Sequence, residues 1–437
     1  MNKLLTNARI IDPFGETEYI ENGYILIEDE TIIEIGAGSA HNIVDETINL
    51  NGKTVLPGMI NVHTHLYSAL AMGMPPPKNI PTNFVEILNE VWWKLDLALD
   101  EESTKASFEA GLMECLMSGV TTVFDHHSSP NFTDGSLELL VDIADKFGQN
   151  ISIAFEITDR NGKEFFKSGL SENIKSFEKF KDNQFVHPLL GLHASFTLSD
   201  ESLRTVYSEI NGMQNLGIHI HVAEDKADEL DAKSKGYESV IDRLNKFKLI
   251  NEHSFIIHGI HSSDKDMELL KNAGATLVHN PTSNANNGVG MLPNSHISLM
   301  NAGLGTDGMR ANMLEEAQQG TLIRSSHIKG DEPSIDYLEL LFKNNPEIAS
   351  RTFGRKIGHL SPDNQADLAI YDYIPRTAIT ENNFAGHILF GFGQPIDVFT
   401  RGKYRIKNRN FIVASERNIK ANAQKQSRRL WNKMNTI

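Results

Sequence analysis

Cysteine and long apolar runs are what this sequence has least of. It contains one cysteine, Cys115, in 437 residues, so an internal disulfide is excluded and the usage fits a reducing compartment. Cys115 lies in an apolar, helix-like stretch, which predicts a buried structural thiol and not a nucleophile. No stretch of about 18 apolar residues occurs, and residues 1–19 hold no apolar run of signal-peptide length. We therefore expect a cytoplasmic protein that does not cross a membrane.

Positive charge is also in deficit. The chain has 41 Lys and Arg residues against 57 Asp and Glu residues, a formal net charge of -16. Nucleic acids and anionic membranes are bound through clustered Lys and Arg, so the composition disfavours both as the main partner. With 40% hydrophobic and 22% charged residues, the chain has a globular composition. Its length predicts one large domain and a smaller one.

Short apolar strands alternate with longer amphipathic segments through the middle of the chain, which is typical of βαβ units. The helical segments include 101–118, 200–213 and 263–272. Eight such units over about 250 residues predict a (β/α)8 TIM barrel, with an open doubly wound sheet as the alternative. The candidate strands are 60–65, 120–127, 151–158, 186–194, 217–224, 254–260, 275–281 and 302–307.

Both ends of the chain have a different texture, with short strands separated by turn dipeptides. The candidate strands are 4–11, 24–27, 31–35 and 54–55 near the start, and 366–372 and 397–403 near the end. We predict an α/β protein in which residues 58–361 form the barrel, and residues 1–57 and 362–437 together form a smaller β-sandwich. Residues 416–433 are basic and amphipathic, which predicts a solvated C-terminal helix.

Two histidines end the first candidate strand of the barrel. His63 and His65 are two residues apart, so in a strand both side chains point to the same side. Active sites of such barrels are built at the carboxyl ends of the strands. Both imidazoles can therefore reach one ion in the barrel mouth.

The fifth candidate strand ends in a second polar group, His219, His221 and Glu224. The two histidines share a face, and His221 lies nearer the strand end, so we predict His221 as a metal ligand and His219 as a core histidine with its hydrogen bonds satisfied. Glu224 follows three residues later. A carboxylate beside a metal-activated water can take a proton and deliver it to a leaving group.

His258 and Asp307 end the sixth and eighth candidate strands. Three histidines and one aspartate with an open position suit zinc, with Fe(II) and Mn(II) as alternatives. Most of the 17 histidines are expected to be ordinary surface or core residues. A metal centre is favoured because polar groups coincide with the ends of four strands, and Glu224 argues against a metal-free binding protein on the same fold.

In this order, these residues resemble the amidohydrolase superfamily, in its cytosine deaminase-like branch with a single metal ion. The matching stretches are PGMINVHTH (57–65), HVAE (221–224), His258, HNP (279–281) and LGTDG (304–308), and residues 357–368 resemble the family's return into its β-sandwich. WWKLDLALDEES (92–103), DHHSSP (125–130), TDRNG (158–162) and NPTSN (280–284) further resemble the SsnA-type aminohydrolases. Guanine deaminase and the triazine chlorohydrolases are more distantly similar.

The resemblance implies site roles and a homodimer. One divalent ion, with zinc expected, would be bound by His63, His65, His221 and Asp307. Glu224 and Asp307 would move protons, and His258 would polarise the substrate. The fourth strand ends in His193, where two-metal relatives carry a carbamylated lysine, so a single ion is expected.

The function implied is hydrolytic deamination of an amino-substituted nitrogen heterocycle, such as a purine, pterin or pyrimidine-like ring, with release of ammonia. Opening of a cyclic amide ring and hydrolytic dehalogenation are alternatives at the same metal centre. A non-catalytic binding protein is the alternative of another class.

Several polar and aromatic side chains are candidate substrate contacts. The Trp pair 92–93 is the kind of pair that also packs in a core, and an Arg after a strand also forms surface ion pairs. The predicted contacts are His126, His127, Arg160, His193, Trp92 and Asn284, and further candidates are Trp93, Glu156, Asn280 and Arg310.

Overall fold

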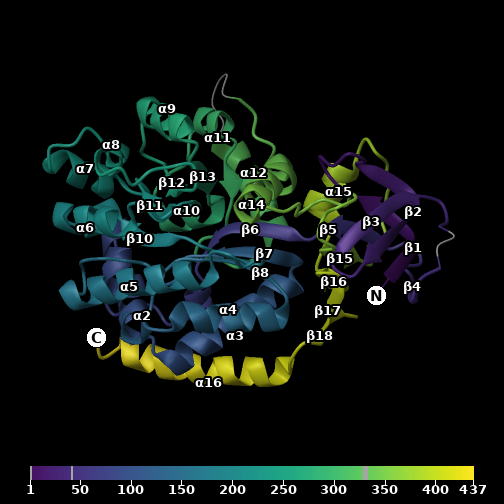
Figure 1. The fold of residues 1–437 in the computed structure, drawn as a ribbon, viewed down its shortest axis with the longest axis horizontal. Coiled ribbons are helices and arrows are strands. Elements are labelled where there is room, and N and C mark those ends of the chain that lie inside the picture. Colours follow the sequence, from purple (N-terminus) through teal and green to yellow (C-terminus); the bar gives the residue numbers. More distant parts are fainter. Residues whose placement is uncertain (1, 41–42, 328–332) are drawn as a thin grey trace.

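The computed structural model describes residues 2–40, 43–327 and 333–437, and there the chain is an α/β protein with parallel sheets (Figure 1). Two parallel sheets have the orders β6-β7-β8-β9 and β10-β11-β12-β13-β14. Each of the eight segments predicted as barrel strands contains a strand. The strands are β6 Met59–Thr64, β7 Val120–Asp125, β8 Asn150–Ile153, β9 Val186–Pro188, β10 Leu190–Ala194, β11 Ile218–Val222, β12 Phe255–His258, β13 Thr276–His279 and β14 Gly303–Leu304.

One predicted strand, 186–194, is divided into β9 and β10. β9 pairs with β8, whereas β10 pairs with β11. The Leu189 amide donates to the Ile153 carbonyl and the Leu190 amide to the Gly217 carbonyl. The chain therefore changes its hydrogen-bonding partner between two adjacent residues, which sequence periodicity alone does not reveal.

The two parallel sheets also touch each other at their outer strands. A parallel bridge joins Ile157, just after β8, to Leu192 of β10, and another joins Thr64 of β6 to Asp307, just after β14. The second bridge brings together the first and last strands of the series. It sets the carboxyl end of β6 beside the residue that follows β14.

Helices pack around the parallel sheets (Figure 1). Asp100 and Ser103 form a capping box at the start of α3, the device that fixes a helix N-terminus. The segments predicted at 101–118, 200–213 and 263–272 are confirmed as α3, α6 and α9. The helices of this region are α1 Phe84–Ile87, α2 Trp93–Ala98, α3 Glu101–Met117, α4 Ser136–Phe147, α5 Lys163–Phe180, α6 Asp200–Ile210, α7 Lys226–Ser234, α8 Val240–Lys246, α9 Asp264–Ala273, α10 Pro281–Asn287, α11 Asn294–Met300, α12 Met313–His327, α13 Tyr337–Glu339 and α14 Asn345–Phe353.

Short 3-10 and π-helical segments interrupt this pattern. η1 and η2 matter for the site, because η1 follows His65 directly and η2 runs into α2. The segments are η1 Leu66–Ala71, η2 Leu88–Trp92, η3 Pro130–Phe132, η4 Ser195–Thr197 and η5 Leu340–Asn344, of which η2 and η5 are π-helical.

A mixed nine-stranded sheet lies beside the parallel sheets and takes strands from both ends of the chain (Figure 1). β5 pairs in parallel with β1 and antiparallel with β15, so early and late segments share one sheet. Some of its buried residues, including Leu5, Ile25 and Phe399, form a separate apolar cluster, whereas others, such as Leu56 and Val398, belong to the large core cluster. The strands are β1 Asn2–Ile11, β2 Tyr19–Glu28, β3 Thr31–Ala37, β4 Glu46–Asn49, β5 Thr54–Pro57, β15 Leu368–Tyr371, β16 Asp397–Thr400, β17 Lys403–Lys407 and β18 Asn410–Phe411, with α15 Phe384–Gly391 between β15 and β16.

The C-terminal helix α16, Glu416–Met434, runs alongside α3 (Figure 1). Ile419 and Leu430 on one face are buried, and the Trp431 Nε1 donates to the Leu70 carbonyl in η1 at 2.9 Å. The prediction of a solvated helix is therefore wrong for this face, because the apolar stripe of the helix is covered by the body of the protein. None of the helices in the described part of the chain combines the length and apolar character needed to cross a membrane.

Candidate metal centre and cavity

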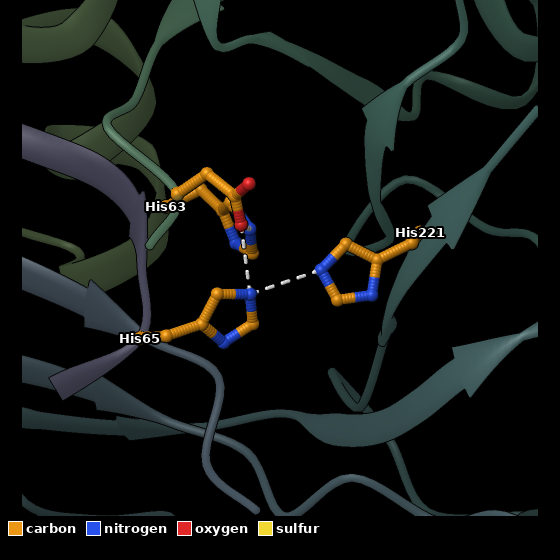
Figure 2. A group of neighbouring side chains, drawn as sticks. His63, His65 and His221 are labelled. Carbon is orange, nitrogen blue, oxygen red and sulfur yellow. Dashed lines mark hydrogen bonds and ion pairs between the residues drawn. The ribbon is translucent and has the colours of Figure 1, made fainter. Parts of the chain in front are cut away.

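Three imidazoles and one carboxylate converge at the carboxyl ends of β6, β11 and β14. Figure 2 shows His63, His65 and His221 turned toward one another. Together with Asp307, each offers one ligand atom, and these atoms lie within 4.8 Å of one another. The His65 Nε2 is 3.2 Å from the His221 Nε2 and 2.8 Å from the Asp307 Oδ1. The donor set is the one that zinc and similar ions prefer.

Hydrogen bonds on the outer side of the rings fix which nitrogen faces inward. The His65 Nδ1 donates to the His126 carbonyl at 2.6 Å, and the His221 Nδ1 donates to the His193 carbonyl at 2.9 Å. A carbonyl can only accept, so both Nδ1 atoms carry a proton, and the Nε2 atoms are left as the ones that would bind an ion, in His65 after loss of the proton that it shares with Asp307. This is the arrangement that metal-binding histidines show in proteins, and the residues present therefore fit a metal ion.

His63 is held by a histidine instead of a carbonyl. Its Nδ1 lies 2.9 Å from the Nε2 of His219, and both rings are completely buried. The expectation that His219 is a core histidine agrees with this burial, but its hydrogen bonds are not all satisfied, because its Nδ1 has no partner among the described residues. Its contact also orients His63, a supporting role that the sequence did not suggest.

Electrostatics in this cluster depend on Asp307. Burial lowers the pKa of His63 to about 3 and that of His221 well below its ordinary value. Burial also lowers the pKa of His65, but the hydrogen bond and the charge of Asp307 outweigh this effect and raise the pKa of His65 to about 9. Burial opposes ionisation of Asp307, yet its hydrogen bonds with His63 and His65 hold the pKa of this carboxyl well below its usual range. The site thus stabilises a carboxylate facing positive charge.

The backbone is left-handed at three residues around the centre. Ala223, His258 and Asp307 have φ angles of 46°, 72° and 52°. Such values are uncommon outside glycine and cost free energy, so they persist where the surroundings enforce them, often at functional sites. Here they turn the chain at the ends of β11, β12 and β14, where the polar side chains emerge.

Glu224 and His258 lie next to the candidate ligands. The Glu224 Oε2 is 3.5 Å from the His258 Nε2, and Glu224, His258 and Asp307 form a second group with ligand atoms within 4.8 Å. Burial raises the pKa of Glu224 to about 7. A carboxyl with a pKa near neutrality can both accept and donate a proton at working pH.

One short helix, α10, contacts three of these groups. The Ser283 Oγ hydrogen-bonds the Asp307 carboxylate, the Asn284 Oδ1 accepts from the His258 Nδ1 at 2.8 Å, and the Asn287 Nδ2 donates to the Glu224 Oε1 at 3.2 Å. Sequence reasoning missed Ser283 and Asn287. The signal was present, because positions 283, 284 and 287 share one face of a helix that follows a predicted strand.

A cavity with an empty volume of about 740 Å³, partly open to solvent, lies against these groups. Trp92 and His193 line it, as does Trp93, whose packing partners include His193 at 6.1 Å between ring centroids. The lining residues are His65, Tyr67, Ser68, Phe84, Leu88, Trp92, Trp93, Asp96, Glu156, His193, Ala194, Phe196, His221, Glu224, Asp225, Ala227, Asp228, Asn287, Asp307 and Gly308.

Four of the six predicted substrate contacts do not line this cavity, namely His126, His127, Asn284 and Arg160. The His126 Nε2 lies 3.1 Å from the His219 carbonyl, and the His127 Nε2 lies 2.6 Å from the Ser129 Oγ. Asn284 is engaged with His258 through α10. His126, His127 and Asn284 are buried at 0–1% exposure, because strand-end side chains in this fold also fill the layer beneath the cavity floor.

Arg160 is not a lining residue, but it supports the cavity wall. Its guanidinium reaches Glu156 at 2.5 Å and Asp96 at 3.4 Å, and it lies 4.6 Å from the centre of the Trp93 ring. The alternative of a surface ion pair does not apply, because both carboxylate side chains are only 2% exposed.

Two further candidates lie elsewhere, and several lining residues were not predicted, two acidic ones among them. Arg310 pairs with Glu114 at 2.9 Å in an exposed position, and Asn280 is fully buried outside the cavity lining. Asp96 and Asp228 line the cavity without having been singled out. Both sit in helical segments whose sequence gives no sign of which face meets a cavity.

Comparison with known proteins places the chain among hydrolases. The model of the Amidohydrolase family matches residues 54–403. A 5-methylthioadenosine/S-adenosylhomocysteine deaminase of Clostridium tetani (strain Massachusetts / E88) is 26% identical over 454 residues, covering 99% of this chain and 100% of the relative. The protein of the same name from Thermococcus onnurineus (strain NA1) is 27% identical, covering 89% and 90% of the two chains.

Solved structures share the fold. An adenosine deaminase from Xanthomonas campestris with bound zinc superimposes with a TM-score of 0.83 at 17% identity, covering 98% of both chains. A guanine deaminase from C. acetobutylicum with bound guanine gives a TM-score of 0.77 at 20% identity, covering 92% of this chain and 100% of the other. At these identities the likeness speaks for the fold alone.

Proposed function

The chain belongs to the amidohydrolase family, and on this premise we propose that it is a hydrolytic deaminase of an amino-substituted nitrogen heterocycle. The enzyme would replace the ring amine of a purine, pterin or pyrimidine-like compound with oxygen from water and release ammonia. The observation that carries this proposal is the convergence of His63, His65, His221 and Asp307 beside Glu224 at the wall of a cavity. The names of the curated relatives, both deaminases, support the same reaction.

We propose that the two parallel sheets form one closed (β/α)8 TIM barrel. The bridges Ile157–Leu192 and Thr64–Asp307 support closure, because they connect the sheets at both sides. The barrel would span residues 58–361, and residues 1–57 and 362–437 would build a smaller β-sandwich domain ending in α16. The shared sheet of β1–β5 and β15–β18 supports this division.

His63, His65, His221 and Asp307 would hold one divalent metal ion. We propose zinc, which three imidazoles and a carboxylate suit, with Fe2+ and Mn2+ as alternatives. Bound there, such an ion would lower the pKa of a coordinated water from 15.7 to about 7 and so supply a nucleophile at neutral pH.

The chain's own residues would then manage protons and charge. Glu224 would take a proton at its carboxylate and deliver it to the departing amine, a task for which its pKa of about 7 is well matched. Asp307 would accept a proton from the attacking water on its side of the centre. The His258 Nε2, 3.5 Å from Glu224, would polarise the substrate by donating a hydrogen bond, a role in which the ring carries a proton on this nitrogen as well as on the Nδ1 that donates to Asn284.

We also propose that the enzyme acts in the cytoplasm on a small molecule, without nucleic acid or a membrane as partner. The net charge of -16 and the single cysteine support this setting. A homodimer is proposed from the family resemblance.

The proposal is tested by an ammonia-release screen across aminopurines, pterins, pyrimidines and triazines, with metal content measured on the same sample. We expect stoichiometric ammonia from at least one amino-substituted ring and about one metal ion per chain. Loss of ring ultraviolet absorbance without ammonia would indicate ring opening, and release of chloride from a chlorotriazine would indicate dehalogenation. Either result in place of ammonia would contradict deamination.

A further inference from the structure

The cavity has an apolar face and an acidic face. Phe84, Leu88 and Trp92 come from the segment α1–η2 and pack in one apolar cluster with their neighbours, which offers a flat surface to an aromatic ring. The acidic lining residues are Asp96, Glu156, Glu224, Asp225, Asp228 and Asp307. Among the described residues that line the cavity there is no Lys or Arg.

Away from the candidate metal ligands, the acidic face is centred on Glu156 and Asp96. The one guanidinium nearby, that of Arg160, already contacts Glu156 at 2.5 Å and Asp96 at 3.4 Å. Two carboxyl groups thus share a single cation, and Arg160 stacks on Trp93 behind the wall. The Arg160 guanidinium is therefore already paired with two carboxyl groups and is not available to an anionic ligand in the cavity.

The acidic face still has a carboxyl oxygen that can accept a hydrogen bond from a ligand. The Glu156 Oε2 lies 3.9 Å from the His126 Nδ1, beyond hydrogen-bonding distance. Burial first, and then the charge of Asp96, raise the pKa of Glu156 to about 8 against the opposing effect of Arg160. Negative charge is therefore already costly here, and a further negative charge from a ligand would be costlier still.

We propose that the trio Asp96–Arg160–Glu156 is a charge filter, which admits ring substrates whose substituents are neutral, hydrogen-bond donating or cationic and rejects those that carry a carboxylate or phosphate. This inference rests on the proposed function, because it assumes that a heterocycle occupies the cavity. At roughly 5 Å and an effective dielectric constant near 20, one like-charge contact with an ionised carboxyl group of the trio weakens binding by about 100-fold, so the effect should grow as the pH rises through the pKa of Glu156, about 8.

Matched ligand series test the filter by binding, independently of turnover. Isothermal titration calorimetry on the metal-loaded protein would use adenine with an ethyl, aminoethyl or carboxyethyl group at N9, and pterin with a methyl, aminomethyl or carboxylate group at C6. We expect the carboxylate member of the series that binds to be weaker than the neutral one by about 100-fold, and the ammonium member to bind at least as well as the neutral one. Equal or tighter binding of the carboxylate member, or no binding in either series, would overturn the filter.

Variants connect the effect to the trio. The double variant Asp96→Asn/Glu156→Gln removes both carboxylates from Arg160. The affinity for the carboxylate ligand relative to the neutral ligand should therefore rise by at least about ten-fold. The single variants Asp96→Asn and Glu156→Gln should each raise the same affinity ratio, and they replace the double variant in the test if the double variant does not fold. Asp134→Asn is the matched control, because it removes the same charge from an exposed ion pair with Lys175. An unchanged preference in all three trio variants would overturn the assignment.

Turnover of the same ligands separates this inference from the proposed function. Ammonia release from neutral and carboxylate members at equal kcat/KM would leave deamination standing and remove the filter. Selective binding of neutral members without any ammonia would leave the filter standing and remove deamination.

Discussion

The hydrogen bond between His258 Nδ1 and Asn284 Oδ1, 2.8 Å long, shows how single side chains set up this centre. Both residues are buried, and the His258 backbone is left-handed. Asn284 was predicted to contact substrate; in the structure it hydrogen-bonds His258 and does not line the cavity, so we expect it to act through His258. Sequence reasoning identified the residue type and position, but only the structure reveals which neighbour it faces.

Asn284→Ala tests this positioning role. Without the amide oxygen, the His258 ring loses its fixed orientation, and we expect kcat for ammonia release to fall by about 10- to 100-fold with little change in KM. Asn245→Ala on the surface of α8 is the matched control, since Asn245 is exposed. A change in KM alone would contradict the positioning role and favour direct substrate contact.

Glu224→Gln tests the proton-transfer role. The amide keeps the shape of the side chain and can still contact Asn287, but it cannot accept a proton. We expect turnover to fall by about 100- to 10,000-fold, while metal content stays at the native level because Glu224 lies outside the four-residue ligand set. Native turnover in this variant would refute the role.

At the scale of whole elements, strand positions were predictable and their pairing was not. The spacing of His63 and His65 predicted the end of a strand, and β6 ends at Thr64, between the two histidines. The switch of partner at Leu189 depends on which backbone lies opposite, and so do the contacts of α10. Such features arise from tertiary packing, which local sequence patterns do not encode.

The helix α16 illustrates the same limit, and its packing is testable. Leu430 is 1% exposed on the face that meets the body of the protein. Leu430→Ala should lower the free energy of unfolding by about 2–5 kcal/mol, measured by urea denaturation, through lost burial and a residual cavity. The exposed Lys425 provides the control Lys425→Ala, for which we expect a change within about 0.5 kcal/mol. Equal effects of the two substitutions would mean that the helix is not packed in solution.

For the whole molecule, the centre draws its ligands from segments far apart in the sequence. His63 and Asp307 are 244 positions apart and approach to 3.3 Å, so a bound ion would tie the beginning and end of the parallel strand series together. The chemistry of the ligands could be inferred from the sequence, because strand ends of a barrel share one face. The acidic cavity wall could not, because Asp96 and Glu156 meet only through the folded chain.

Removal of the metal should therefore affect stability as well as activity. An ion that binds the folded state alone stabilises it by mass action. After dialysis against a chelator we expect ammonia release to disappear and Tm to fall, with both restored by stoichiometric Zn2+. An unchanged Tm together with full activity in metal-free protein would exclude a metal centre that supports the fold and the reaction.

The most direct test of the central claim is anomalous X-ray diffraction from crystals of the purified, metal-loaded protein. We predict one strong peak per chain, about 2.0–2.2 Å from the Nε2 atoms of His63, His65 and His221 and from a carboxylate oxygen of Asp307. A peak elsewhere, no peak among these side chains, or a second fully occupied ion beside the first would contradict it.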